Sequence, residues 1–197
     1  YLGNKTKLLN FIDKVIDKYN IEGTIFADLF AGTGCVGDFF KDKYKIISND
    51  FLYYSYILNI AKLQNPKKPS FTKFRKKFGI DIYNWLNNLK FKPNKSFFFY
   101  YNYTPKGNRM FFTEKNGIKI DGVRQKIEEL YKNKLVTENE YYFLLASMIE
   151  SITKVSNNSG TFEAFFKFWD SRAEKDFEII PLEINEVELA DKNEIFN

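Results

Sequence analysis

Two acidic residues and two glycines stand close together in a pattern that could hold a nucleoside. Asp28 ends one apolar run and Asp50 ends the next, while Gly32 and Gly34 lie in the loop between them. Glycines permit sharp turns and leave backbone N–H groups open to a ligand, especially where a helix begins directly after them. An acid at the end of the second strand can accept both hydroxyls of a ribose. The stretch therefore predicts a nucleoside pocket.

The glycine pattern by itself leaves the ligand open. Gly32, Gly34 and Gly37 spell Gly-x-Gly-x-x-Gly, the fingerprint of dinucleotide-binding sites. However, Asp28 lies before the first glycine, and a carboxylate there would repel a pyrophosphate. The same carboxylate suits the ammonium group of S-adenosylmethionine. The sequence therefore favours this methyl donor over a nicotinamide dinucleotide, and a glycine-rich turn that binds nothing is a third interpretation.

The spacing of apolar residues predicts the helices and strands that must position these residues. We expect helices over residues 4–19, 35–41 and 51–63, and strands over residues 24–26 and up to residues 49–50. Pro66 and Pro69 then break the chain, which marks a boundary after residue 63. The order helix, strand, helix, strand, helix is typical of an α/β sheet.

The rest of the chain predicts a mostly helical lobe inserted into this sheet domain. Three helices are indicated by apolar spacing and caps: residues 71–91, residues 116–133 opened by Asp121, and a helix capped by Thr137 and Glu140. Two short strands are indicated near the end: residues 177–182 and 186–189. We therefore expect a sheet domain at residues 1–63 and 176–197 around an inserted lobe at residues 64–175.

The composition excludes several classes of function. The 197 residues include one cysteine and no histidine, which excludes a disulfide framework, a histidine-based zinc site and an imidazole base from this chain. We expect no metal site. No apolar run approaches the length of a membrane span, so we expect no membrane contact and a cytoplasmic location. The chain opens with Tyr1 rather than Met, which suggests that it begins inside a longer protein.

Positive charge is concentrated in the middle of the chain. Residues 62–134 hold 18 Lys and Arg against 5 Asp and Glu, although the net charge of the whole chain is only +5. Such a segment favours a polyanionic partner, most simply nucleic acid, because each phosphate contact releases counterions. The aromatic run at residues 97–103 could stack on unpaired bases or pack a small core, and core packing is the commoner role of such residues.

Three motifs taken together resemble the Dam-like group of adenine-specific DNA methyltransferases. The segment YLGNK, at residues 1–5, resembles that family's aromatic-x-Gly-x-Lys motif, and DLFAGTG, at residues 28–34, resembles its acid-x-Phe-x-Gly-x-Gly loop. Asn49 and Asp50 match its Asn-Asp turn on the ribose. The resemblance implies a Rossmann-like methyltransferase sheet with an inserted target-recognition lobe. It also implies that S-adenosylmethionine is bound by Tyr1, Gly3, Asn4, Lys5, Asp28, Phe30, Gly32, Gly34, Asp50 and Phe51.

The same resemblance implies double-stranded DNA as the partner. RMFFTEKNGIKIDGVR, at residues 109–124, and SNNSGTFEAFFKFW, at residues 156–169, are similar to stretches of type II restriction-modification relatives. A restriction endonuclease is therefore a further possible partner. The candidate DNA contacts are Lys106, Asn108, Arg109, Lys115, Arg124, Asn157 and Asn158.

The catalytic motif of this family is missing from the chain. The family's reaction depends on an Asp/Asn/Ser-Pro-Pro-aromatic motif that binds the amino group of a flipped adenine, and no two prolines are adjacent here. The family places that motif after a strand near residues 184–189. We therefore expect a fragment that ends before its catalytic residues and transfers no methyl group alone. Two other functions stay open, a nicotinamide-dependent oxidoreductase and a non-catalytic nucleic-acid-binding module.

Overall fold

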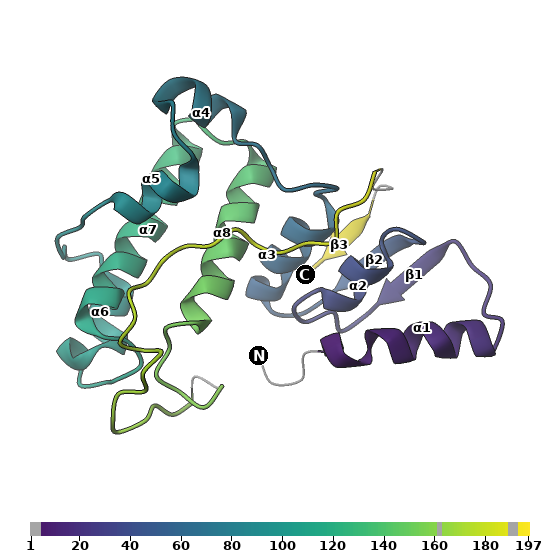
Figure 1. Cartoon of the computed structure of the whole chain (residues 1–197), viewed down its shortest axis with the longest axis horizontal. Coiled ribbons are helices and arrows are strands. Elements are labelled where there is room, and N and C mark those ends of the chain that lie inside the picture. Colours follow the sequence, from purple (N-terminus) through teal and green to yellow (C-terminus); the bar gives the residue numbers. More distant parts are fainter. Residues whose placement is uncertain (1–4, 161–162, 189–192) are drawn as a thin grey trace. The chain divides into compact units, whose positions relative to one another are not determined.

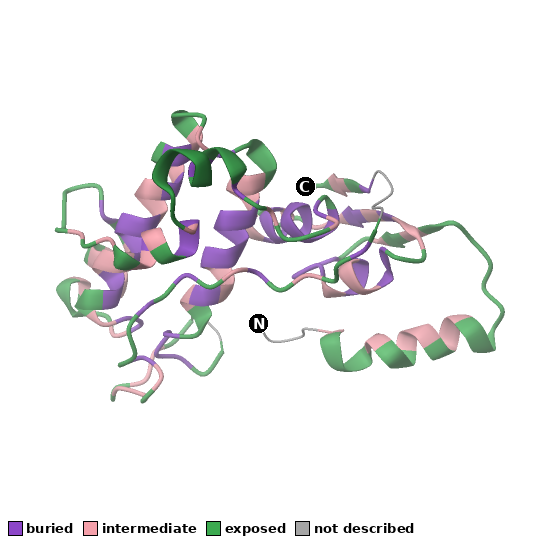
Figure 2. Cartoon of the chain, turned by 45° about the horizontal axis from the view of Figure 1, so that its top comes forward, coloured by how far each residue is buried: buried purple, intermediate pink, exposed green. Residues whose placement is uncertain are grey.

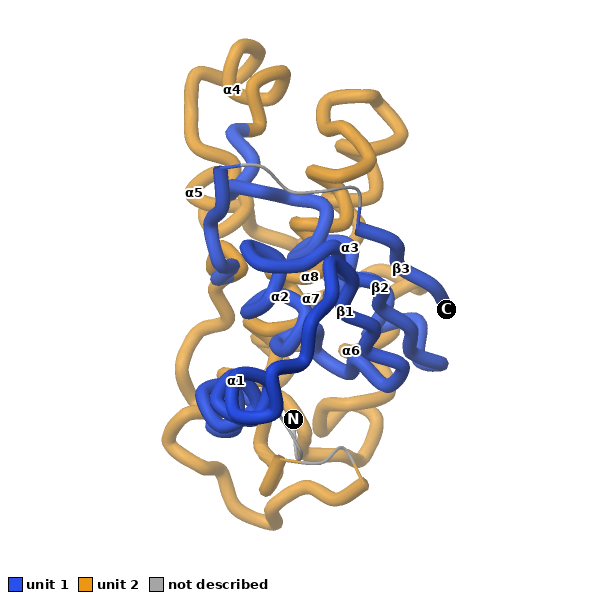
Figure 3. Tube along the Cα trace, turned by 90° about the vertical axis from the view of Figure 1, so that its right-hand side faces the viewer, with its two compact units in different colours: residues 1–70, 183–197 blue, residues 71–182 orange. Residues whose placement is uncertain are grey.

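The computed structural model describes residues 5–160, 163–188 and 193–197, and the chain divides into two compact units (Figure 1, Figure 3). Unit 1 consists of residues 1–70 and 183–197, and unit 2 consists of residues 71–182. Unit 2 is thus an insertion between two parts of unit 1 along the sequence. The functions expected of the sheet domain and of the lobe stay predictions.

Unit 1 is built on a parallel sheet whose described strands follow the order β1-β2-β3 (Figure 1). The strands are β1 (Ile25–Asp28), β2 (Lys45–Asn49) and β3 (Glu194–Phe196). Asp28 lies opposite Ser48 in the β1–β2 register, and Ser48 lies opposite Ile195 in the β2–β3 register. Parallel strands end at the same edge of a sheet, so the loops that follow β1 and β2 are neighbours. The predicted α/β class and the first two strands are confirmed.

Helices of unit 1 pack against the sheet through a small apolar core. The helical elements are η1 (Lys5–Leu8), α1 (Leu9–Lys18), α2 (Cys35–Phe40) and α3 (Tyr53–Leu63). Their core consists of Val36, Phe40, Ile46 and Leu63, and the Phe26 ring stacks on Phe40 with 4.9 Å between centroids. Removing these side chains from water is the main favourable term that holds α2 and α3 against β2. The three helices predicted for this region are confirmed, with ends that differ by a few residues.

The regular elements of unit 2 are all helices within its described residues. Its elements are α4 (Thr72–Phe78), α5 (Ile82–Asn88), α6 (Phe98–Tyr103), η2 (Pro105–Gly107), α7 (Glu114–Lys132) and α8 (Glu138–Thr153). Buried residues line α8, as Figure 2 shows, and Thr137 and Glu140 form the predicted capping box at its start. Within the described part of the chain, no helix has both the length and the apolar character that crossing a bilayer requires.

The single helix predicted over residues 71–91 is wrong, because the helix breaks at residues 79–81. Gly79 ends α4 in the left-handed conformation, with φ of 68°. Asp81 then caps α5 by accepting hydrogen bonds from the N–H groups of Tyr83 and Asn84, both at 3.0 Å. A C-terminal glycine followed by an acidic N-cap is a signal for two helices, and it outweighs the continuous apolar spacing.

The predicted start of α7 at Asp121 is also wrong. Thr113 caps this helix through a hydrogen bond from the Asn116 N–H, and Asp121 lies in its middle. The Asp121 carboxylate instead accepts hydrogen bonds from the N–H groups that begin α6, those of Phe98 and Phe99 at 3.0 Å and of Tyr100 at 2.8 Å. Asp121 therefore caps a different helix from the one that contains it.

The strands predicted at residues 177–182 and 186–189 are wrong for the described residues, which reach 188. Phe177, Ile179 and Leu182 are buried, as their apolar types suggested. Their N–H groups bind side chains rather than a neighbouring strand, namely Asn116 Oδ1 at 2.9 Å, Asn87 Oδ1 at 2.9 Å and Ser147 Oγ at 3.0 Å. An extended segment needs no sheet partner when buried side chains satisfy its backbone.

Candidate functional site

The loop between β1 and α2 has the backbone that its glycines predict. Gly32 and Gly34 adopt positive φ angles of 54° and 72°, which residues with a Cβ rarely adopt. The Gly34 N–H closes a turn onto the Ala31 carbonyl at 2.9 Å, and the Ala31 N–H donates to the Asn49 carbonyl at 3.0 Å. These bonds hold the loop across the ends of β1 and β2, where ligands bind in open α/β sheets.

Asp50 connects this glycine loop to the end of β2. Its Oδ2 accepts a hydrogen bond from the Gly32 N–H at 2.8 Å, and its Oδ1 accepts one from the Leu52 N–H at 3.0 Å. Each carboxylate oxygen has two acceptor positions, so Asp50 retains capacity for two hydroxyl donors. The residue can therefore brace the loop and accept hydrogen bonds from a ribose at the same time.

Asp28 presents an unsatisfied carboxylate oxygen beside the loop. Its Oδ1 accepts a 3.4 Å hydrogen bond from the Phe30 N–H, whereas its buried Oδ2 has no hydrogen-bond partner among the described residues. A buried carboxylate oxygen without a partner is costly, and an ammonium group of a ligand would remove that cost. The site thus fits the amino-acid end of S-adenosylmethionine.

Two exposed aromatic rings flank these acids. The Phe30 side chain is 81% exposed and the Phe51 side chain is 93% exposed, which is unusual for phenylalanine. Phe30 lies two residues after Asp28 in the sequence, and Phe51 directly follows Asp50. Exposed aromatic faces of this kind can pack against a planar base.

Two residues of α3 also hold the glycine loop, and the sequence analysis missed both. Asn59 Nδ2 donates to the Gly32 carbonyl at 3.1 Å, and Lys62 Nζ donates to the Thr33 carbonyl at 2.8 Å. Asn59 is 1% exposed and Lys62 is 8% exposed. A polar pair three residues apart within a buried apolar helix was the available signal, because such positions are normally apolar.

The glycines of the fingerprint serve packing as well as ligand access. A Cβ at Gly34 would lie 2.7 Å from Asn59 Oδ1, and a Cβ at Gly37 would lie 3.1 Å from side-chain atoms of Ile46 and Leu63. Gly37 therefore allows α2 to approach β2 and α3 closely. The third glycine of the pattern is explained by helix packing, with no need for a dinucleotide.

Of the cofactor residues predicted from the amino-terminal motif, the structure describes Lys5. Tyr1, Gly3 and Asn4 lie outside the described residues. Lys5 begins η1 and is partly exposed. Their role in ligand binding stays a prediction.

Among the predicted DNA contacts, one group forms an exposed turn in unit 2. Lys106, Asn108 and Arg109 are exposed around η2, and Asn108 adopts a left-handed conformation with φ of 58°. Arg109 Nη1 donates to the Asn102 carbonyl at 2.9 Å, which fixes the turn against α6. These side chains are accessible to a partner.

Two further predicted DNA contacts lie on α7 and take part in ion pairs. Lys115 is exposed and pairs with Asp176. Arg124 Nη1 donates to Glu128 Oε2 at 3.0 Å, and the Tyr141 hydroxyl also donates to that oxygen at 2.8 Å. These hydrogen bonds hold the pKa of Glu128 below its usual value.

Asn157 and Asn158 are buried, with exposed fractions of 0% and 2%. Asn157 Nδ2 donates to the carbonyls of Met110, Phe166 and Phe168 at 2.9 to 3.1 Å, and its Oδ1 accepts from the Asp170 N–H at 3.0 Å. These contacts assign Asn157 to holding the loop around residues 163–170. Burial leaves neither asparagine accessible to DNA in this conformation.

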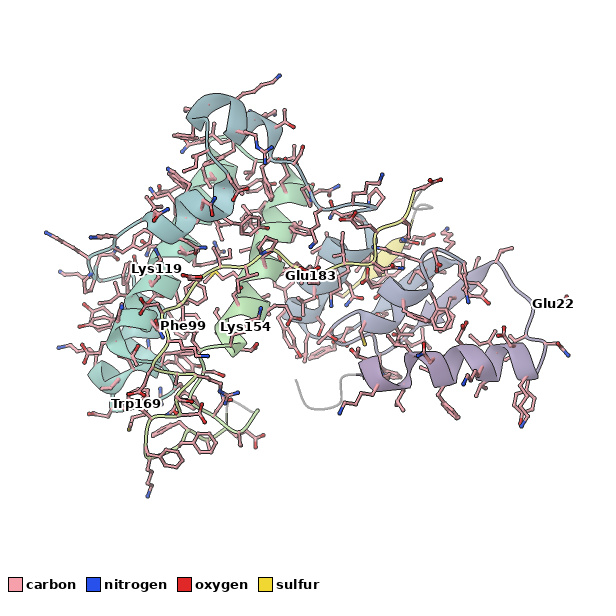
Figure 4. The ribbon with its side chains drawn as sticks, in the orientation of Figure 1. Glu22, Phe99, Lys119, Lys154, Trp169 and Glu183 are labelled. Atoms are coloured by element: carbon pink, nitrogen blue, oxygen red, sulfur yellow. The ribbon has the colours of Figure 1, made fainter. Side chains whose placement is uncertain are left out.

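Two side chains of α7 hold the ends of neighbouring helices, namely α5 and α6, and the exposed turn directly follows α6. Lys119 lies on α7 (Figure 4). Its Nζ donates to the last carbonyls of α5, including that of Asn87 at 2.7 Å, and burial lowers the pKa of Lys119. Burial raises the pKa of Asp121, against the opposing effect of the three N–H groups of α6 that it accepts. A lysine at a helix C-terminus and an acid at a helix N-terminus both match the helix dipoles.

The aromatic run divides between core and surface. Phe97 is 3% exposed, and the Phe99 ring packs against the fully buried Phe112 with 5.7 Å between centroids. Phe98 and Tyr101 are instead 57% and 39% exposed. Core packing therefore explains one side of α6, and aromatic side chains remain accessible on the other.

Comparison with known proteins places this site in a family. The profile of the D12 class N6 adenine-specific DNA methyltransferases matches residues 1–197. The chain is 53% identical over its full length to modification methylase LlaI of Lactococcus lactis subsp. lactis, of which it covers 32%. It is 39% identical over 98% of its length to type II methyltransferase M.FokI of Planomicrobium okeanokoites, of which it covers 30%.

A third relative, type II methyltransferase M.NlaIII of Neisseria lactamica, is 35% identical over 92% of the chain, which spans 53% of that protein. The chain thus spans about a third of the length of the first two methylases and about half of the third. No solved structure matches it. Since the family profile covers the chain from end to end and includes its glycine loop and both acids, the chain belongs to the D12 class N6 adenine-specific DNA methyltransferases.

Proposed function

We propose that the full-length protein containing this chain transfers a methyl group from S-adenosylmethionine to the exocyclic amino group of adenine in double-stranded DNA. Unit 1 binds the methyl donor, and unit 2 contacts the DNA. The observation that carries the proposal is the buried Oδ2 of Asp28 beside the positive-φ glycine loop, an oxygen to which no described residue donates a hydrogen bond. An oxygen in that state suits a cationic ligand group, and the family membership supports the same chemistry.

On the donor side, the residues of unit 1 bind and orient without taking part in bond formation. The Asp28 carboxylate receives the ammonium group, and the Asp50 carboxylate accepts the ribose hydroxyls while it holds the Gly32 N–H. Phe30 and Phe51 provide apolar faces for the adenine ring. The bound donor supplies an electrophilic methyl group, and orientation of that group toward the amine supplies much of the rate.

On the DNA side, unit 2 offers charge and an accessible turn. Lys106, Asn108 and Arg109 are exposed, and the contact between Arg109 and Asn102 fixes their backbone. Lys115 and Arg124 would exchange their carboxylate partners for phosphates of the DNA. The affinity that such contacts provide falls as the salt concentration rises. Asn157 and Asn158 are left out of the proposed contacts because they are buried.

The residues that hold the target amine are absent from this chain. The family's Pro-Pro motif does not occur in the 197 residues, so no step at the adenine is assigned to them. We propose that this chain provides the donor site and part of the DNA surface of the enzyme. Relatives carry the names modification methylase and type II methyltransferase, which supports a cognate restriction endonuclease as a further partner.

Calorimetry and a methylation assay on the full-length protein test the proposal. We expect S-adenosylmethionine and its demethylated product to bind, NAD not to bind, and labelled methyl groups to appear on adenine in duplex DNA. Tight binding of NAD with none of the methyl donor would favour an oxidoreductase instead. Binding of DNA without any methyl transfer by the full-length protein would favour a non-catalytic module.

A further inference from the structure

We propose that Asn59 and Lys62 are positioning residues for the methyl donor, because they fix the orientation of the peptide groups that form the glycine loop. The inference rests on the proposed function and concerns the same site. Both residues reach the loop through their side chains, and neither is adjacent to it in sequence, since the two contacts span 27 and 29 residues.

The two side chains hold consecutive carbonyl groups of the loop. Asn59 Nδ2 donates to the Gly32 carbonyl at 3.1 Å, and Lys62 Nζ donates to the Thr33 carbonyl at 2.8 Å. Both carbonyls therefore point toward α3. In a trans peptide group the C=O and the N–H point in opposite directions, and the described chain has no cis peptide bonds.

This orientation determines which loop amide can face a ligand. The Gly32 N–H is held by Asp50 at 2.8 Å, and the Gly34 N–H is held by the Ala31 carbonyl at 2.9 Å. The Thr33 N–H belongs to the same peptide group as the Gly32 carbonyl, so it points away from Asn59. No described residue accepts a hydrogen bond from it. Asn59 thus directs the Thr33 amide away from α3, and the peptide orientation that results is the part of the loop proposed to meet the methyl donor.

Asn59 also connects the loop to the strand that precedes Asp50. Its Oδ1 accepts a hydrogen bond from Ser48 Oγ at 2.7 Å, and a Cβ at Gly34 would lie 2.7 Å from that same oxygen. The loop therefore rests directly on the Asn59 amide. A change in the donor or acceptor at this position would alter the loop without removing any residue proposed to touch the ligand.

Lys62 adds a buried positive charge behind the loop. It is 8% exposed, and no carboxylate of a described residue lies within ion-pair distance of its ammonium group. Burying an uncompensated charge is expensive, so the Thr33 carbonyl is the feature that keeps the ammonium group in place. The Thr33 carbonyl shares its peptide group with the Gly34 N–H, so this charge strengthens the turn that the Gly34 N–H closes onto the Ala31 carbonyl.

Steady-state kinetics of the full-length protein test the inference through Asn59→Asp. Aspartate has the same shape but cannot donate to the Gly32 carbonyl. The variant also loses the bond from Asn59 Nδ2 to the Ser55 carbonyl, one turn back in α3, which does not involve the loop. We expect KM for S-adenosylmethionine to rise about tenfold, as for loss of the one buried hydrogen bond to the loop, with kcat and KM for DNA unchanged within about twofold. Asn65→Asp is the matched control, because Asn65 is a buried asparagine whose Nδ2 donates to the Ala61 carbonyl and does not contact the loop.

Lys62→Met and Lys62→Arg provide a second test that does not depend on the Asn59 variant folding. We expect Lys62→Met to raise the same KM and Lys62→Arg to restore it in part, because arginine keeps the charge and the donors. An unchanged KM in both Asn59→Asp and Lys62→Met would overturn the inference, as would an equal rise in Asn65→Asp. Failure of the wild-type protein to methylate would count against the proposed function instead, so the two can be distinguished.

Discussion

The Asp50 carboxylate and the Gly32 backbone amide form a 2.8 Å hydrogen bond across 18 residues of sequence. This bond makes the acid after β2 and the glycine loop after β1 a single structural unit. The acid that would accept ribose hydroxyls therefore also determines the loop conformation. A change at Asp50 acts on the ligand directly and through the loop.

Asp50→Asn tests this dual role. An amide retains one acceptor oxygen but loses the charge, and its NH₂ group cannot accept from either backbone donor. We expect the Kd of S-adenosylmethionine to rise about ten- to a hundredfold, the usual range for a hydrogen bond to a charged group, measured by calorimetry. Asp42→Asn, at an exposed acid outside the site, is the control and should leave the Kd unchanged. Equal affinity in wild type and Asp50→Asn would contradict the assignment.

Asp28→Asn tests recognition of the ammonium group. We expect the variant to bind S-adenosylmethionine about tenfold or more weakly, because one charge-assisted pair is lost. Methylthioadenosine, which lacks the amino-acid end, should bind wild type and variant equally. Competition binding with both ligands gives the ratio. If both ligands weaken together, Asp28 supports the loop rather than the ammonium group.

The sequence predicted the glycine loop and its flanking elements well because their signals are local. Apolar runs, glycines and acids between residues 24 and 50 indicated β1, α2 and β2 within a few residues of their ends. Positive φ angles at Gly32 and Gly34 follow from the residue type alone. The hydrogen bond from the Gly32 N–H to Asp50 was not predicted, although two parallel strands that end at one edge of a sheet bring these residues close together.

What the sequence could not predict depends on side chains that bind distant backbone groups. Asp121 resembles a helix cap in sequence, yet the helix that it caps begins 23 residues earlier. The alternating pattern at residues 177–182 is that of a strand, but Asn87, Asn116 and Ser147 satisfy its amides. Asn59 and Asn157 likewise act over long separations. Such contacts leave no periodicity, so they become visible only in the folded chain.

Asn157→Ala should destabilise unit 2. The change removes a buried amide that binds three carbonyls and one N–H group. We expect a loss of about 2 to 4 kcal/mol in unfolding free energy, as for other broken buried networks. Hydrogen exchange should accelerate in residues 163–170 before it does so in α8. Unchanged protection of that loop would show that Asn157 is dispensable to it.

Asn108→Gly should weaken DNA binding without loss of stability. Glycine keeps the left-handed backbone of this position, where φ is 58°, and removes only the exposed side chain. We expect an affinity loss of about fivefold or more, corresponding to one contact of about 1 kcal/mol. Fluorescence anisotropy with a duplex that contains the recognised site measures it at fixed salt. Equal affinity would exclude Asn108 from the DNA surface.

Glu128→Gln should reduce the loss of α7 stability at acid pH. The Tyr141 hydroxyl and then Arg124 depress the pKa of Glu128 below its usual 4.5. A depressed pKa stabilises the folded state above the unfolded-state value, and this contribution disappears as pH falls through the folded-state pKa. Wild type should therefore lose more protection than the variant between about pH 5 and pH 3, by less than about 1 kcal/mol because the pair is largely exposed.

Hydrogen exchange of α7, corrected for intrinsic rates, measures the difference. Glu129→Gln, on the same helix and paired with Lys126, is the control, and a response equal to that of Glu128→Gln would attribute the effect to net charge rather than to this contact.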